Sequence, residues 1–365
     1  MSGLYIHIPF CASRCIYCDF YSTTGLKLQE QYVDALIREL QLTTSPGQGQ
    51  CSTIYIGGGT PSTLSTALLD QLFAALPQGA EEFTMECNPD DITQEFAEWL
   101  GSTDVNRVSM GAQTFSDERL QWLNRRHRSH QVDHAVQLLR DAGIRNISID
   151  LMFGFPGETL DDWQRDIDHA LMLRPEHISA YSLMYEEGTP LYRMLERGEI
   201  EEIDDELSLK MYDTLIDRLT AAGYEHYEIS NFCLAGHHSR HNSSYWRQVP
   251  YLGIGAAAHS FDGNHRWSNI ADVKEYISSI NTGKLPREAE SIDRRTRYND
   301  IVTTAMRTRE GICLNDLNAT ERDYLVAQAM PHIRAKRLVL TDTHLHLTRK
   351  GIYTSDDIMS DLIQL

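Results

Sequence analysis

Short apolar runs alternate with longer amphipathic segments through the first half of the chain. The apolar runs, which have the length of strands, cover residues 4–8, 53–56, 83–87, 107–110, 147–151 and 177–183. Between them, apolar residues recur three or four positions apart over residues 28–43, 65–76, 93–100, 117–124, 131–142 and 160–173, as they do in helices. Strands that alternate with helices in this way predict βαβ units and a parallel sheet.

Polar and glycine-rich residues follow the ends of these predicted strands. A cysteine-containing loop follows the first strand, and the run Gly57-Gly58-Gly59-Thr60-Pro61 follows the second. Glu86 and Asp150 end two other strands, and Gln113 lies three residues past another. In β/α barrels the carboxyl ends of the strands build the active site, so we expect these residues to gather at one edge. Six units are too few for the usual eight-stranded barrel.

The alternation weakens beyond residue 200. A long helix is predicted over residues 204–222 and a further strand over 224–229, whereas residues 230–270 indicate loops and short elements across the barrel mouth. Helices near 299–308 and 320–330, a hairpin at 338–347 and a last helix from 355 have the order of a winged helix. We therefore predict a barrel over residues 1–230, a connecting segment over 231–289 and a small C-terminal α+β domain over 290–365.

Three of the seven cysteines are close together, with the spacing C-x-x-x-C-x-x-C at Cys11, Cys15 and Cys18. Thiolates select zinc, copper(I) or iron–sulfur clusters. A structural zinc site needs four ligands, and no fourth cysteine or histidine stands at ligand spacing. A [4Fe–4S] cluster takes one ligand per iron, so three cysteines leave one iron open for a substrate or cofactor. The spacing favours the cluster over zinc, and a disulfide is the weakest interpretation because three is odd.

Composition and charge limit the setting in which the chain works. A formal net charge of −19 argues against general binding to nucleic acids, which needs a basic surface. We see no apolar run near the ~20 residues of a spanning helix, and no secretion signal opens the sequence. These features predict a cytoplasmic protein with reduced thiols and at most a peripheral association with membranes.

The cysteine spacing resembles that of the radical S-adenosylmethionine (SAM) superfamily. The sequence motif H-I-P-F-C-x-x-x-C-x-Y-C-D-F resembles that of the branch to which the oxygen-independent coproporphyrinogen III oxidases (HemN) and the HemW family of heme chaperones belong. The resemblance implies an open (β/α)6 partial barrel with a small winged-helix-like domain. It also implies that SAM chelates the open iron, and that reduction of the cluster cleaves SAM to a 5'-deoxyadenosyl radical.

The same resemblance implies a set of residues that bind SAM. An arginine suits the SAM carboxylate, acidic and amide side chains suit its ribose hydroxyls, and a glycine motif suits its amino group. The residues that match the motifs of the branch are Tyr5, Tyr17, Gly57, Gly58, Gly59, Thr60, Glu86, Gln113, Arg125 and Asp150. Taken singly, each polar residue also fits an ordinary surface position, the glycines fit a tight turn, and Tyr5 fits the core.

A second motif lies near the start of the predicted connecting segment. His241, Asn242, Tyr245 and Trp246 match H-N-x-x-Y-W, which is characteristic of the HemW branch and is associated with heme binding. Imidazole is a common ligand of heme iron, and aromatic neighbours could stack on a porphyrin. On the residues alone, a loop histidine hydrogen-bonded to the backbone is the more ordinary interpretation, and the resemblance shifts the balance toward heme.

Two functions from different classes fit the cluster: a heme carrier and a coproporphyrinogen III oxidase. The oxidase has a fourth cysteine two residues after the third, where this chain has Phe20, and a long extension before the first strand. Together with the H-N-x-x-Y-W motif, these differences favour a heme chaperone over the oxidase and over another radical SAM reaction. The expected cofactors are a [4Fe–4S] cluster, SAM and heme, and the expected partners are acceptor hemoproteins, of the respiratory chain or a heme or iron store.

Overall fold

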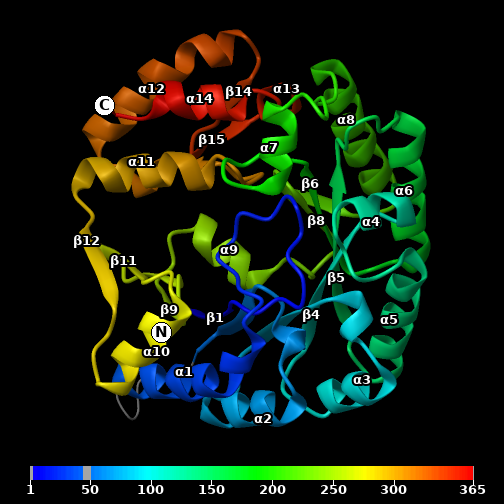
Figure 1. Ribbon diagram of the computed structural model, residues 1–365. Helices are drawn as coiled ribbons and strands as arrows, with labels where there is room; N and C mark the ends of the chain where they lie inside the picture. Colours follow the sequence, from blue (N-terminus) through cyan, green and yellow to red (C-terminus); the bar gives the residue numbers. More distant parts are fainter. Residues whose placement is uncertain (1–2, 44–50, 365) are drawn as a thin grey trace.

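The computed structural model describes residues 3–43 and 51–364, in which twelve strands form one curved sheet (Figure 1). Its centre is six parallel strands in sequence order, which confirms the predicted α/β fold and the open barrel of six βα units. These strands are β1 (Gly3–Ile8), β2 (Thr53–Gly58), β3 (Glu82–Cys87), β4 (Arg107–Gln113), β5 (Asn146–Phe153) and β6 (His177–Ser182).

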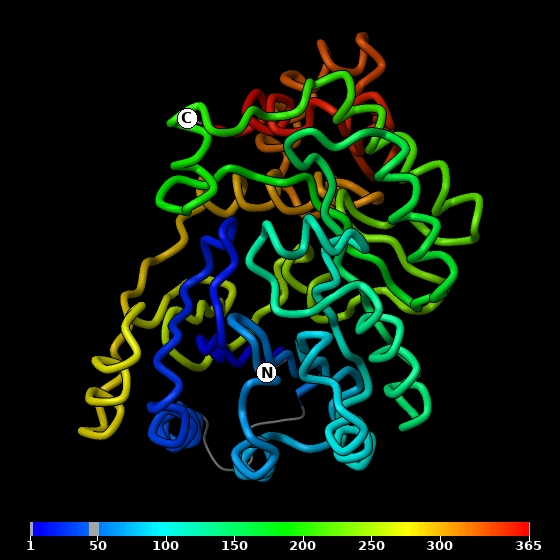
Figure 2. Tube along the Cα trace, turned by 45° about the vertical axis from the view of Figure 1, so that its right-hand side comes forward, coloured from blue at the N-terminus to red at the C-terminus, as the bar shows by residue number. Residues whose placement is uncertain are grey.

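Helices cover the outer face of these strands (Figures 1 and 2). They are α1 (Gln29–Thr43), α2 (Thr66–Ala75), α3 (Gln94–Gly101), α4 (Asp117–Trp122), α5 (Ser129–Asp141) and α6 (Leu160–Leu173). Side-chain caps set several starts: Ser65 accepts from the amide of Leu68, and Thr93 accepts from that of Phe96. The helices therefore begin where the sequence places hydroxyl residues before an apolar run.

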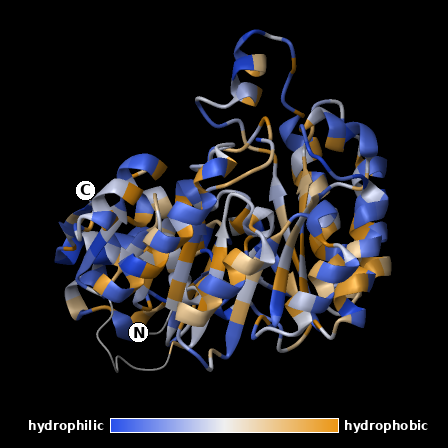
Figure 3. Ribbon diagram, turned by 60° about the horizontal axis from the view of Figure 1, so that its bottom comes forward, coloured by the Kyte–Doolittle hydropathy of each residue, from blue (hydrophilic) through white to orange (hydrophobic). Residues whose placement is uncertain are grey.

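The parallel strands alternate between an apolar face and a largely polar face. Leu4, Ile6 and Ile8 of β1 belong to the main apolar core, whereas Tyr5 and His7 between them belong to the other face. The same alternation gives the concave face a polar lining, which includes Thr53, Tyr55, Thr84, Glu86, Arg107, Ser109, Ser148, Asp150, His177 and Ser179. The core thus lies between the sheet and the helices, and the barrel interior is polar. Figure 3 shows hydrophobic and hydrophilic positions mixed along both layers.

The sheet continues beyond both ends of the parallel barrel. Next to β6 lie β8 (Asn231–Cys233) and β7 (Glu225–Glu228), and next to β1 lie β9 (Tyr251–Ile254), β10 (His259–Phe261), β11 (His265–Asn269) and β12 (Arg287–Ser291). Residues 230–270 contain the expected short elements, but the strands among them extend the sheet instead of crossing the barrel mouth. In particular, β9 pairs with the free edge of β1 and satisfies its backbone groups. The proposed boundaries at 230 and 289 stay predictions.

Four more helices belong to this part of the chain: α7 (Pro190–Glu196), α8 (Asp205–Ala221), α9 (Arg240–Trp246) and α10 (Val273–Asn281). Figure 1 shows α9 inside the curve of the sheet rather than on its outer face. The side chain of Glu82 fixes its start, since both carboxylate oxygens accept backbone amides, from Arg240 and His241, each at 2.9 Å. The motif expected to bind heme is therefore a short helix within the barrel.

The C-terminal region has an apolar core of its own, built around Tyr298, Val302, Leu325, Leu345 and Ile358. Its elements are α11 (Arg294–Ala305), β13 (Ile312–Cys313), α12 (Ala319–Arg334), β14 (Leu338–Leu340), β15 (His344–Leu347), α13 (Arg349–Ile352) and α14 (Ser355–Leu362). This order confirms the winged-helix-like prediction, with β14 and β15 as the hairpin. Figures 1 and 2 both show the region at one side of the barrel, beside α8.

Candidate functional site

A cavity of about 430 Å³ opens at the carboxyl ends of the parallel strands and collects most of the predicted site residues. Its lining includes Cys11, Cys15, Cys18, Tyr17, Gly58, Gly59, Thr60, Glu86, Gln113, Arg125 and Asp150. Gly57 and Tyr5 are outside this lining. The hydroxyl of Tyr5 instead meets Nδ1 of His7 at 3.0 Å, and its ring lies beside that of Tyr55.

The cysteine loop is held in place by backbone contacts with its neighbours. The amide of Cys11 donates to the carbonyl of Thr23 at 3.0 Å, and the side-chain amide of Asn124 donates to the carbonyl of Arg14 at 2.7 Å. All three cysteines are free thiols, with Cys11 buried and the other two half-buried. The loop therefore presents three thiols to one cavity from a fixed backbone.

The electrostatics of the thiols depend on burial and on one cation. Burial raises the pKa of the Cys18 thiol to about 11 and raises that of Cys11 as well. The guanidinium of Arg125, which lies 3.6 Å from Sγ of Cys15, opposes this effect of burial on the pKa of Cys11. Bound iron would supply the remaining positive charge that deprotonates the thiols.

The arrangement of possible ligand side chains distinguishes a single zinc ion from an iron–sulfur cluster. Across residues 3–43 and 51–364, no three histidine, cysteine, aspartate or glutamate side chains converge on a single-ion position. A lone zinc therefore gains no support from the geometry. In a [4Fe–4S] cluster each thiolate binds a different iron, so the ligands need not converge on one point. Three unpaired thiols around one cavity fit that group.

The glycine segment after β2 packs directly against the cysteine loop. The amide of Gly59 donates to the carbonyl of Ile8 at 2.8 Å, and the amide of Thr60 donates to that of Phe10 at 2.8 Å. A Cβ on Gly59 would lie 2.8 Å from that same Phe10 oxygen, and Gly58 has a φ of 110°. Gly59 requires glycine because its backbone comes this close to the loop that carries Cys11, and Gly58 requires it because of its positive φ.

Glu86 supports the same segment from β3. Its Oε2 accepts the amide of Gly58 at 3.1 Å, and its Oε1 accepts the hydroxyl of Tyr55 at 2.7 Å. Burial raises the pKa of Glu86 to about 7, and burial also raises the pKa of Asp150 across the cavity. Two desolvated carboxyl groups on one cavity suit a ligand with a cation and hydroxyls, as SAM has.

Arg125 is fixed by acceptors that the sequence analysis did not single out. Its Nη2 donates to Oδ1 of Asn88 and to the carbonyl of Gly111, both at 2.5 Å, whereas its buried Nε has no partner among the described residues. Arg107 also lines the cavity, and its Nε and Nη1 are buried and unpartnered in the same part of the chain. The alternation of apolar and polar residues in β4 could have identified Arg107 as facing the interior.

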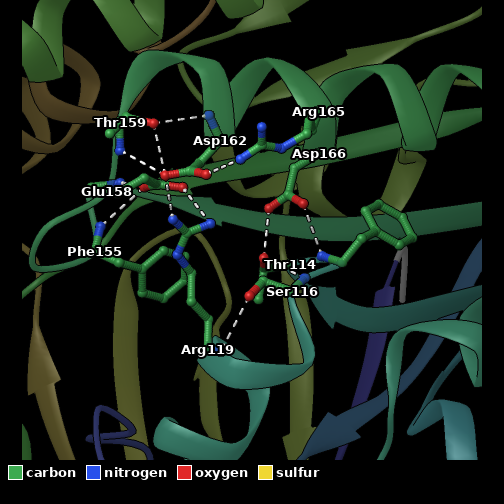
Figure 4. A network of polar contacts seen from close by, with 11 residues as sticks. Thr114, Ser116, Arg119, Phe155, Glu158, Thr159, Asp162, Arg165 and Asp166 are labelled. Atoms are coloured by element: carbon green, nitrogen blue, oxygen red, sulfur yellow. Dashed lines mark hydrogen bonds and ion pairs between the residues drawn. The ribbon is translucent and has the colours of Figure 1, made fainter.

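A polar network behind the cavity holds the loops after β4 and β5 (Figure 4). The carboxylate of Asp166 accepts the hydroxyl of Thr114 at 2.6 Å and the amide of Phe115 at 3.0 Å. Glu158 accepts the amide of Gly154 at 2.6 Å and pairs with Arg119 at 3.4 Å. These contacts fix the segment that follows Gln113, whose φ of 66° turns the chain at the cavity edge.

The predicted heme residues on α9 point in different directions. His241 is fully buried, with Nδ1 2.8 Å from Oγ1 of Thr53 and Nε2 2.7 Å from the hydroxyl of Tyr245. Burial lowers the pKa of His241 to about 3, so the ring is neutral. Asn242 lines the cavity of the cysteines, whereas Trp246 lines a larger cavity on the other side of the helix. The structure thus gathers most of the residues predicted to bind SAM at one cavity, whereas those predicted to bind heme divide between the core and two different cavities.

Comparisons with known proteins find similarity over part of the chain in one case and over nearly all of it in others. A model of the radical SAM superfamily matches residues 5–170. A protein named heme chaperone HemW from Bacillus subtilis is 38% identical, over 98% of this chain and 98% of that protein. Another of that name, from Lactococcus lactis, is 33% identical over 99% of this chain and 97% of its own length. These alignments span both the barrel and the C-terminal region.

Among solved structures, coproporphyrinogen III oxidase (HemN) from Escherichia coli has the same fold. The TM-score is 0.83, and the match covers 99% of this chain and 90% of that one. The sequence identity is 20%, so this likeness concerns the fold alone. Because the fold is common to proteins of different function, the residues of the site have to distinguish the chaperone from the oxidase.

Proposed function

This chain belongs to the HemW family of heme chaperones, a branch of the radical SAM superfamily, and we propose that it binds heme and delivers it to acceptor hemoproteins. The observation that carries the proposal is identity of 33–38% to such chaperones along almost the whole chain. No helix among the described residues is long and apolar enough to cross a membrane. We propose that the protein acts in the cytoplasm.

We assign the cavity at the strand ends to the cluster and SAM that the family implies. Cys11, Cys15 and Cys18 would hold a [4Fe–4S] cluster. The residues that would position SAM are Tyr17, Gly57, Gly58, Gly59, Thr60, Glu86, Gln113, Arg125 and Asp150. Tyr5, whose ring lies beside that of Tyr55, would support them from outside the cavity lining. A reduced cluster with bound SAM supplies a route to a 5'-deoxyadenosyl radical. The chain itself contributes a desolvated pocket, two carboxyl groups and a buried guanidinium.

Phe20 supports the carrier function over the oxidase. It stands where the resembling oxidases have a fourth cysteine, lines the cavity mouth and is 66% exposed. An exposed aromatic ring cannot ligate iron or donate a proton, as a thiol can. The chain therefore lacks a group that the resembling oxidases place at this position.

The experiment that tests the proposal starts from protein whose cluster is reconstituted without oxygen. Titration with hemin should give a saturable Soret band, because a carrier must bind heme stoichiometrically. The same sample, given SAM, a reductant and coproporphyrinogen III, should form no protoporphyrinogen, because Phe20 replaces the oxidase cysteine. Catalytic formation of protoporphyrinogen, or the absence of a Soret band at saturating hemin, would refute the carrier function.

A further inference from the structure

The larger cavity lies between the barrel and the C-terminal region and has a volume of about 1040 Å³. Its walls come from α9, α11, β10 and the sheet of β13 and β15, with Trp246 and Phe261 among the lining residues. Small-molecule pockets typically measure ~300–1,000 Å³, so this cleft can take a large ligand. Among the described residues it shares no lining residue with the cysteine cavity, and α9 separates the two.

Two arginines give this cleft a local positive charge in a chain of net charge −19. Arg247 and Arg297 line it, and in the described part of the chain neither side chain makes a hydrogen bond or an ion pair. The other lining arginines are engaged, Arg240 with Glu81 and Arg309 with Glu310. Asp316 is the lining acid left outside these pairs. Free guanidinium groups around a large cleft suit a ligand with carboxylates.

The C-terminal sheet supplies ligand chemistry to the same cleft. His344 of β15 pairs in register with Cys313 of β13, and both side chains line the cleft. Nδ1 of His344 lies 2.9 Å from Oγ1 of Thr343, whereas Nε2 makes no hydrogen bond or ion pair within residues 3–43 and 51–364. An imidazole nitrogen that is not engaged in a hydrogen bond is an ordinary axial ligand for iron.

We infer that this cleft is the heme site, with His344 ligating the iron and with Arg247 and Arg297 binding the two propionates. Trp246 adds an apolar wall from α9, and its buried Nε1 has no partner among the described residues. The inference rests on the proposed function and deepens it. It also gives α9 a role, as the wall that keeps heme apart from the cluster and SAM.

Other histidines near the cleft are less suited to ligate the iron. His241 uses both ring nitrogens in hydrogen bonds and is fully buried. His238 lines the cleft, but its Nε2 lies 3.4 Å from Glu225 and its ring packs edge-on against Tyr227. His241 therefore fixes α9 against β2 instead of facing the heme.

The test uses the full-length protein and three porphyrins. The Arg247→Gln, Arg297→Gln double variant should bind hemin roughly tenfold to a hundredfold more weakly, because two charge-assisted pairs are lost. Hemin dimethyl ester, which lacks propionate charges, should bind wild type and double variant equally. His344→Ala should shift the Soret band of bound hemin, yet leave the affinity for iron-free protoporphyrin IX unchanged.

Matched controls separate this site from general damage. Arg295→Gln, on the same helix as Arg297, and His346→Ala, on the same strand as His344, change residues outside the cleft lining and should behave as wild type. If the variants bind all three porphyrins like wild type, the site is misplaced although the carrier function stands. A Soret change in Cys313→Ser or His241→Ala but not in His344→Ala overturns the ligand assignment. Failure of wild type to bind hemin refutes the function itself.

Discussion

Replacing Cys18 by alanine is expected to abolish the [4Fe–4S] cluster and, with it, the binding of SAM. Cys18 would hold one of the three irons that the protein ligates, and its removal would leave Cys11 and Cys15 as the remaining thiols of the cysteine loop. A cluster left with two protein ligands has two open irons and should be lost on desalting. The measurement is iron and sulfide content, with visible absorption, after anaerobic reconstitution.

Cys233→Ala provides the matched control for this prediction. Cys233 is also a buried free thiol, but it lies in β8 away from the cysteine cavity. This variant should keep about four irons per chain, as expected of a [4Fe–4S] cluster, with at most a modest loss of stability from the small cavity left behind. Full iron content in Cys18→Ala would remove the thiol from the ligand set.

The second large effect is expected at Asp150, on the inner face of β5. Its carboxyl group faces the cysteine cavity, and its hydrogen-bond partners are hydroxyls, those of Ser109, at 3.5 Å, and of Ser179. The carboxylate is thus available for a ligand's hydroxyls. Loss of one or two charge-assisted hydrogen bonds, at about 1.5–3 kcal/mol each, predicts that Asp150→Ala binds SAM at least tenfold more weakly.

Equilibrium binding of SAM to the reconstituted protein measures this, with iron content determined on the same sample. The iron content should stay at the wild-type level, because Asp150 contacts no cysteine. Asp141→Ala, at the exposed end of α5, is the control and should leave SAM affinity unchanged. Equal SAM affinity in Asp150→Ala and wild type would place the SAM pocket elsewhere.

The parallel sheet and the cysteine edge could be predicted from the sequence because local patterns determine them. Each strand is a short run with apolar residues at alternate positions, each helix has period 3.6, and the chain returns to the same edge after every βα unit. Cys11, Gly59 and Glu86 meet for that reason alone, since all three follow or end parallel strands. Predicting this edge therefore needs no knowledge of contacts between segments far apart in the sequence.

The remaining features depend on contacts between segments far apart in the sequence. The pairing of β9 with β1 joins residues about 250 positions apart, and no local pattern near Leu252 indicates it. The position of α9 depends on Glu82, whose carboxylate caps the helix from another element. The direction in which His241 points follows from that cap, so motif matching alone could not show that its ring is buried.

The alternation of polar and apolar residues within the strands also carries information about the site. Arg107 and Ser109 alternate with Val108 and Met110, which marks a strand with one polar face. Treating the runs as uniformly apolar hid this face. The polar lining of the barrel interior is the part of the site that sequence reasoning could have found and did not.

Direct delivery of heme tests the central claim most directly. Heme-loaded protein would be mixed with the apo form of a heme-dependent respiratory enzyme, in the presence of excess apomyoglobin, which captures free heme. We predict that the enzyme gains heme and activity despite the scavenger, because a chaperone passes heme within a complex. Capture of all the heme by apomyoglobin, with no gain of enzyme activity, would contradict the account.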